Sequence, residues 1–220
     1  MTRALLTVLL PIIFLAGPAA AQNQPLIPPP GRAEALSALA HKDAKLRRGA
    51  AARLGELGTM ADVMALAKAL RDTDEETREA AEKSLWQVWA RSGNPDVDNL
   101  YRAGVEQMGG GERQKAISTF TRVIELKPDF AEGWNKRATL YFITGDYRKS
   151  LADCNEVIKR NPQHFGALAG YGQIYLRLEE YDRALDYFRR ALEVNPNMDS
   201  VRLNILLLEK MQEQRHKRMI

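Results

Sequence analysis

Apolar residues recur with helical spacing through the second half of the chain. Trp134, Ala138 and Tyr141 lie three and four positions apart, so a helix places them on one face. A second stripe of the same kind begins with Ile117 and Phe120. A single pair of helices cannot bury both stripes, which indicates that several pairs stack against one another.

The helical pattern is repeated at a fixed interval. Pro128, Pro162 and Pro196 are 34 residues apart, and each closes a stretch of the same pattern. Proline ends a helix because it lacks the backbone N–H and restricts the residue before it. Matching positions in the superposed segments are Leu100 with Trp134 and Leu168, Gly104 with Ala138 and Gly172, Tyr141 with Tyr175, Ala116 with Ala184, Phe120 with Phe188, Ile124 with Ile158 and Leu192, and Tyr147 with Tyr181.

These residues resemble the tetratricopeptide family, whose 34-residue unit is a helix pair with small residues where the helices touch. The resemblance implies three units within residues 97–198, over 97–130, 131–164 and 165–198. The first unit is the least regular, because Gln107 and Arg113 stand where other copies have tyrosines. We interpret it as an end repeat adapted to a neighbour. The three glycines at 109–111 leave a loose hinge as the alternative.

Residues 33–92 carry a different repeat with an interval of 31 residues. The recurring positions are Leu39, Asp43, Arg47, Ala50 and Leu54, followed by Leu70, Asp74, Arg78, Ala81 and Leu85. This pattern resembles HEAT-like repeats and implies two helical hairpins. Asp43 and Asp74 suit helix N-termini, where a carboxylate accepts unpaired N–H groups. Trp86 and Trp89 fall on one face, and we expect the first tetratricopeptide unit to cover it.

Residues 199–220 predict a capping helix that ends in a basic tail. Val201, Ile205, Leu208 and Met211 share one side, which we expect to pack against the third unit. Extra leucines within residues 203–208 widen this stripe, so self-association is the alternative. The predicted fold is all-α: an alpha-alpha superhelix, or solenoid, of two HEAT-like helical hairpins, three tetratricopeptide helix pairs and the capping helix.

The start of the chain is typical of a secretory signal peptide over residues 1–21. A positive start at Arg3 precedes an apolar run, and small residues at 19–21 stand before Gln22. We expect cleavage there and export, most simply to a bacterial periplasm. A retained membrane anchor is the alternative, although the apolar run is shorter than a membrane span needs. Residues 22–32 contain four prolines and predict an extended linker.

Composition narrows the possible functions. A net charge of +4 is too small to indicate nucleic-acid binding. The basic tail, residues 215–218, is expected to be solvated, with contact to an anionic membrane as the alternative. Cys154 is the only cysteine and occupies the register of Phe120 and Phe188, so we expect a buried and unreactive thiol.

No catalytic constellation is visible in the sequence. The histidines, His41, His164 and His216, lie in separate segments without metal-ligand spacing, and His164 stands in an inter-unit turn where a polar residue is ordinary. Paired acids such as Glu179 and Glu180 fall at turns and read as solvated. We therefore expect no enzyme activity, no cofactor and no metal site.

The family resemblance implies a concave groove, lined by the first helix of each unit, that receives a peptide or protein segment. Carried over by position, its residues are Tyr101, Arg102, Asn135, Lys136, Thr139, Phe142, Gln173, Leu176 and Arg177. Asn135 and Gln173 would bond a peptide backbone, and Phe142 would contact an apolar side chain. The alternative binding surface is the HEAT-like block.

The function we expect is an exported, non-catalytic adaptor in cell-envelope assembly or maintenance. The alternative is a regulatory subunit of an envelope enzyme complex, with membrane contact through the basic tail.

Overall fold

The computed structural model describes residues 30–219, and within them every regular element is a helix. The predicted leader and all but the end of the predicted linker lie outside the described residues. The elements are α1 (Arg32–Ala38), α2 (Ala44–Leu57), the short 3-10 helix η1 (Met60–Asp62), α3 (Val63–Ala69), α4 (Glu75–Trp89), α5 (Pro95–Gly109), α6 (Arg113–Leu126), α7 (Ala131–Ile143), α8 (Tyr147–Arg160), α9 (Phe165–Arg177), α10 (Tyr181–Val194) and α11 (Asp199–Met219).

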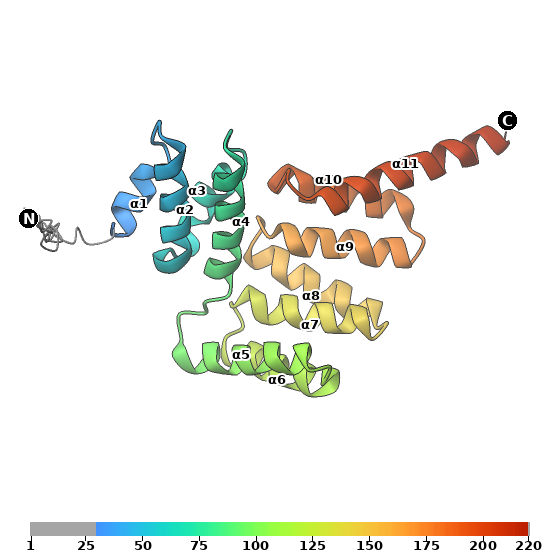
Figure 1. The fold of residues 1–220 in the computed structure, drawn as a ribbon. Coiled ribbons are helices and arrows are strands. Elements are labelled where there is room, and N and C mark those ends of the chain that lie inside the picture. The colour runs from blue at the N-terminus through green and yellow to red at the C-terminus, as the bar shows by residue number, and fades with distance from the viewer. Residues whose placement is uncertain (1–29, 220) are drawn as a thin grey trace, which may run out of the picture.

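Figure 1 shows an α-helical solenoid, as the sequence predicts. Helix pairs α5–α6, α7–α8 and α9–α10 stack in chain order, and α11 covers the last pair. Helices α1–α4 form a separate block at one side of the stack. The axes of α2 and α4 run across the direction of the repeat helices. The HEAT-like character of this block stays a prediction. Its helix starts are as expected: Asp43 accepts from the N–H of Lys45, and Asp74 from that of Thr77, each at 2.9 Å.

The two helices of a pair approach closely where the first helix has a small residue. A Cβ on Gly104 would lie 2.8 Å from the Phe120 ring, and one on Gly172 would lie 2.4 Å from the Phe188 ring. Each phenyl ring therefore fills the space that a side chain would need. In the middle pair the corresponding contact is between Ala138 and Cys154, and both residues are buried. Cys154 is smaller than the phenylalanines of the other two pairs, so alanine fits where they have glycine.

The α1–α4 block docks on the edge of the stack that carries the turns between units. Trp86 and Trp89 contact His164 and Phe165 at the start of α9, with ring centroids 4.4 to 5.4 Å apart. Asn197, in the turn before α11, donates to the carbonyl of Leu70 at 2.8 Å. The expectation that the first unit covers these tryptophans is therefore wrong. The chain turns back after α4, and the block lies beside the turn that opens the third unit.

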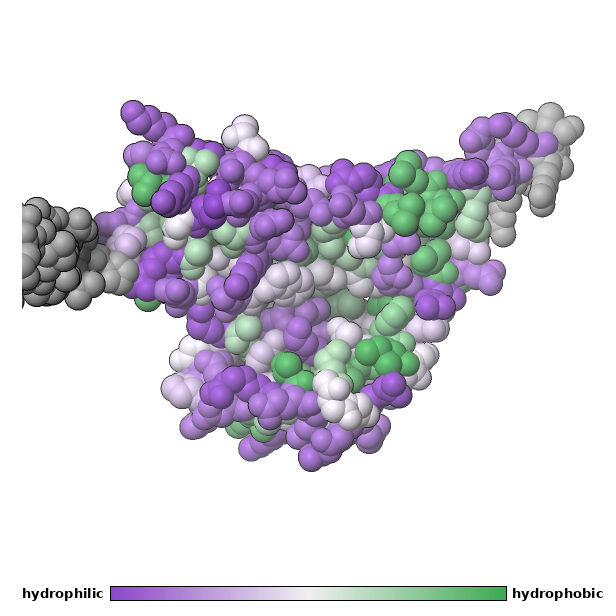
Figure 2. Space-filling model, viewed as in Figure 1, coloured by the Kyte–Doolittle hydropathy of each residue, from purple (hydrophilic) through white to green (hydrophobic). Residues whose placement is uncertain are grey.

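Helix α11 packs on the third pair through Val201, Ile205 and Leu208, all buried as the sequence predicts. Met211 does not continue this contact, since 41% of it is exposed. Within 203–208 the exposed leucines are Leu203, Leu206 and Leu207. They form part of the hydrophobic surface over α11 that Figure 2 shows. Among residues 30–219, no helix combines the length and apolarity of a membrane span.

Candidate functional site

A cavity of about 130 Å³ opens between the first helices of the second and third pairs. Asn135, Thr139 and Phe142 of α7 line one side, and Gln173 of α9 lines the other. The thiol-bearing residue Cys154 of α8 also lines it. Four of the nine groove residues inferred from the sequence thus share one concave site.

The cavity follows from the composition of the middle pair. Cys154 stands where the flanking pairs have Phe120 and Phe188, and the missing ring volume is not refilled by a larger neighbour. A Cβ added to Gly170 on the facing helix would contact only the Cys154 sulfur, at 3.8 Å. Burial, followed by the charge of Asp153, raises the pKa of the Cys154 thiol to about 12. The expected burial of Cys154 is confirmed, and its low reactivity stays a prediction.

The polar groups around the cavity differ in their availability. The Asn135 amide donates to Glu132 Oε1 at 3.0 Å, so one of its two N–H donors is already used within the protein. The Thr139 hydroxyl donates to the carbonyl of Asn135 at 2.9 Å. The side chain of Gln173 makes no hydrogen bond to the described part of the chain. Its carboxamide is therefore the polar group that a ligand would meet.

Next to the cavity, the Glu132 carboxylate is buried with only 1% exposed. Its Oε1 lies 2.6 Å from His164 Nε2, and its Oε2 accepts from the Tyr101 hydroxyl at 3.2 Å. Lys136 Nζ lies 3.5 Å from Oε2 and faces the Trp86 ring. One carboxylate therefore joins residues of the first and second units, including the histidine that caps α9, and its neighbour Lys136 contacts the α1–α4 block.

The hydrogen bonds of His164 fix its tautomer. Nδ1 accepts from the backbone N–H of Ala167 at 3.0 Å, so the proton of the neutral ring is on Nε2 and is donated to Glu132. Burial opposes ionisation of Glu132. The hydrogen bonds from His164 and Asn135 and the charge of Lys136 outweigh it and lower the pKa of Glu132 to about 2.

The remaining groove residues lie away from the cavity or face inward. Tyr101 is a core residue rather than a groove residue, because its ring packs against Phe120 and Phe130 and is 6% exposed. Lys136 is held by Glu132 and Trp86. Arg102 and Arg177 are exposed and Leu176 is half-buried, none of them at the cavity.

The buried pair of Glu132 and His164 was not predicted from the sequence. The signal was present in the repeat register, where Phe130 and Met198 correspond to His164. A histidine at an apolar position predicts burial with a hydrogen-bond partner. No group of three His, Cys, Asp or Glu residues within 30–219 has the arrangement of a metal site.

Comparison with known proteins places the repeats in a family. A tetratricopeptide-repeat model matches residues 101–163 and again residues 135–199. A tetratricopeptide-repeat-containing protein of Rhizobium etli is 35% identical over 126 residues. That alignment covers 57% of this chain and 61% of the relative, less than two thirds of its length.

Solved structures agree in fold. The first tetratricopeptide domain of Spaghetti (RPAP3), bound to an HSP90 peptide, superposes with a TM-score of 0.52 at 20% identity, covering 53% of this chain and 93% of that domain. The Sgt2 tetratricopeptide domain of Aspergillus fumigatus gives 0.53 at 21% identity, covering 56% and 83%. These structures share the fold of the stacked helix pairs, and the family model matches residues 101–199 of this chain as tetratricopeptide repeats.

Proposed function

We propose that this chain is a non-catalytic adaptor that binds a peptide or protein segment in the groove between α7 and α9. The observation that carries the proposal is the cavity of about 130 Å³ created by Cys154 at a phenylalanine register. It has roughly the volume of four water molecules in the liquid, so an aliphatic side chain is a suitable occupant. The RPAP3 domain, which shares the fold, is bound to a peptide in its solved structure.

The groove offers two kinds of contact to such a segment. The half-buried Phe142 ring, tilted on Tyr147 at 5.8 Å, provides an apolar wall at the cavity. The Gln173 carboxamide both donates and accepts, which matches the alternating groups of a peptide backbone. The ligand is therefore an extended segment that inserts one apolar side chain beside Cys154 and bonds Gln173 through its main chain.

Filling the cavity is expected to weaken this binding without unfolding the protein. The double variant Ala138→Gly with Cys154→Phe copies the arrangement of Gly104 with Phe120 in the preceding pair. The new phenyl ring should therefore fit against residue 138 as Phe120 fits against Gly104. A peptide would first be selected from a displayed random library on immobilised residues 22–220. Its affinity for the double variant should fall at least about tenfold, measured by calorimetry, since a buried aliphatic contact contributes about 1.5–3 kcal/mol.

Two controls decide the outcome. Gln173→Ala should weaken the same peptide while leaving the cavity open, and circular dichroism should show an unchanged helix content for both variants. If the well-folded filled variant keeps the affinity of the unaltered protein, the groove between α7 and α9 is not the binding site, and the α1–α4 block becomes the better candidate.

We further propose that the protein is exported and acts in cell-envelope assembly or maintenance. The support is the leader-like pattern of residues 1–21, which lies outside the described residues. Mass spectrometry of protein from an exporting cell should show a chain that begins at or near Gln22. A membrane-bound chain that retains Met1 would contradict cleavage.

The second candidate is a regulatory subunit of an envelope enzyme complex, touching the membrane through the basic tail. Crosslinking in the periplasm separates the two: one stoichiometric enzyme favours the subunit, and a set of non-enzymatic partners favours the adaptor. Self-association through residues 203–208 stays a prediction, which sedimentation over a range of concentrations would test.

A further inference from the structure

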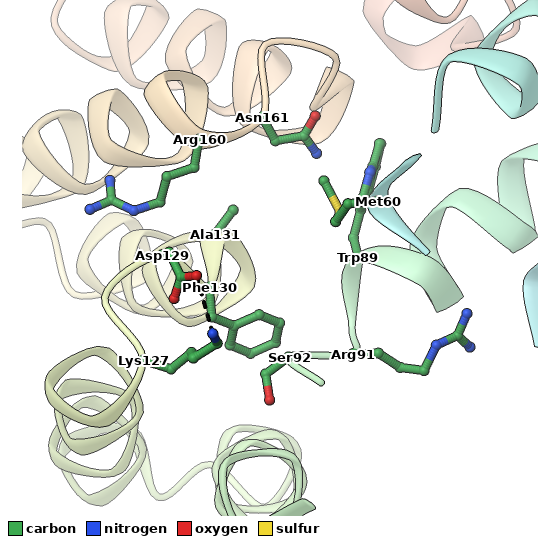
Figure 3. Close-up of a pocket in the computed structure, with 10 residues that line it drawn as sticks. All are labelled: Met60, Trp89, Arg91, Ser92, Lys127, Asp129, Phe130, Ala131, Arg160 and Asn161. Atoms are coloured by element: carbon green, nitrogen blue, oxygen red, sulfur yellow. Dashed lines mark hydrogen bonds and ion pairs between the residues drawn. The ribbon is translucent and has the colours of Figure 1, made fainter. Parts of the chain in front are cut away.

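A second cavity, of about 210 Å³, lies where the α1–α4 block meets the edge of the repeat stack. Figure 3 shows its lining: Met60 and Trp89 come from the block, and Phe130 and Asn161 come from the repeat turns. We name it the junction crevice. It is separate from the groove between α7 and α9, with which it shares no lining residue.

Two buried donors of the junction crevice have no hydrogen-bond partner. They are the indole nitrogen Nε1 of Trp89 and the amide nitrogen Nδ2 of Asn161. Both residues are 3% exposed. In Figure 3 the Asn161 amide nitrogen points towards Met60 and the Trp89 ring. Because a buried donor without an acceptor is costly, two of them lining one cavity indicate a site for an acceptor.

The repeat itself shows which acceptor this position binds. Asn195 is the counterpart of Asn161 one unit later, and both asparagines use Oδ1 to accept from the backbone N–H two residues on, at 3.0 and 3.2 Å. The Nδ2 of Asn195 donates to the Glu82 carboxylate of α4 at 3.0 Å. At Asn161 the residue that α4 contributes is Trp89, another donor, so α4 supplies no acceptor there and a bound molecule would take the place of the Glu82 carboxylate.

The charges around the crevice favour an anion. Arg91, Lys127 and Arg160 line it, against one acid, Asp129. Lys127 pairs with Asp129 at 3.1 Å and Arg160 with Glu156 at 2.6 Å, whereas Arg91 is held by the neutral carbonyls of Gly55 and Gly58. Arg91 therefore supplies the net positive charge beside the two neutral donors.

We propose that the junction crevice binds a carboxylate carried on a small apolar group. The carboxylate oxygens accept from Trp89 Nε1 and Asn161 Nδ2, and the apolar body lies against Met60 and Phe130. The volume is about that of seven water molecules in the liquid, which suits a group the size of one amino-acid residue. Two sources carry this chemistry: the C-terminal residue of a peptide and a free short-chain carboxylic acid.

Nuclear magnetic resonance of the protein as residues 22–220 tests the site directly. The chain has three tryptophans, so the indole N–H region holds three signals, and Trp89→Phe identifies that of Trp89. Titration with N-acetyl-alanyl-leucine should move the Trp89 signal downfield as its hydrogen bond forms. The C-terminal amide of the same dipeptide should leave it in place. Pentanoate, titrated separately, tells whether a free acid suffices or the peptide bond is needed.

Three variants complete the test. Asn161→Asp keeps the acceptor for Gln163 but replaces the donor by a repelling charge, and it should weaken the carboxylate probe at least about tenfold. Trp89→Phe, monitored through the Asn161 side-chain amide signal, should weaken it similarly. Asn155→Asp adds the same charge on an exposed face of α8 and should have no effect.

A Trp89 signal that responds to neither carboxylate probe overturns the proposal, as does equal binding of the dipeptide amide. Unchanged affinity in a well-folded Asn161→Asp protein also overturns it.

Discussion

Replacing Glu132 by alanine is expected to lower the free energy of unfolding by several kcal/mol, because three buried donors lose their acceptor at about 1–3 kcal/mol each. The carboxylate is 1% exposed and accepts from three side chains of different elements. Its removal leaves donors on Tyr101, Asn135 and His164 without their acceptor. Each of these groups stays buried, so water cannot replace the lost bond without opening the structure.

The loss should extend beyond the local contact. His164 stacks on Trp89, with centroids 4.4 Å apart, and this stack joins the α1–α4 block to the turn before α9. When Glu132 no longer holds Nε2, the imidazole is free to turn, and the block loses part of its docking surface. We therefore expect the variant to unfold with a smaller dependence on urea, or in two steps, as the block separates before the repeats.

Urea unfolding followed by circular dichroism and by tryptophan fluorescence measures both effects. Glu125→Ala is the matched control, because Glu125 is an exposed acid of α6 that pairs with Arg122, and its loss should cost less than about 1 kcal/mol. A Glu132→Ala protein as stable as the control would show that the buried cluster does not hold the units together.

The repeat fold was predictable because the same helical pattern, closed by a proline, occurs three times in the sequence. The prolines at 34-residue intervals end the helices, and Gly104 and Gly172 stand where a phenyl ring of the paired helix presses against the backbone. The middle pair departs from this pattern in the sequence as well, because Cys154 at a phenylalanine register implies a smaller side-chain volume in the core. The structure adds that Ala138 faces it and that the deficit is open to the groove.

The docking of the α1–α4 block was not predictable in the same way. Chain order suggested the first unit as the neighbour of Trp86 and Trp89, whereas the turn after α4 brings them to His164 and Phe165. A local pattern specifies an apolar face but not which distant face covers it. The prediction of Tyr101 as a groove residue was wrong for a related reason. Its position in the family places it on the groove helix, but its hydroxyl donates to the buried Glu132.

Acid is expected to destabilise the protein through Glu132 in the range between about pH 4.5 and pH 2. The ordinary pKa of this carboxyl is 4.5, and in the folded protein it is lowered to about 2. A lowered folded pKa means that the unfolded chain binds the proton first. The stabilisation is therefore complete above pH 4.5 and is lost as the pH falls towards 2.

Comparison with Glu132→Gln isolates this contribution. Glutamine has the shape of glutamate and still accepts from His164, but it does not titrate. Other carboxyls with lowered pKa values, such as Asp72 and Asp74, are present in both proteins and cancel in the difference. The stability advantage of the unaltered protein, measured by urea unfolding from pH 6 to pH 2.5, should shrink steadily below pH 4.5. An advantage that stays constant over this range would mean that Glu132 is not the ionised acceptor of His164, Tyr101 and Asn135 in the folded protein.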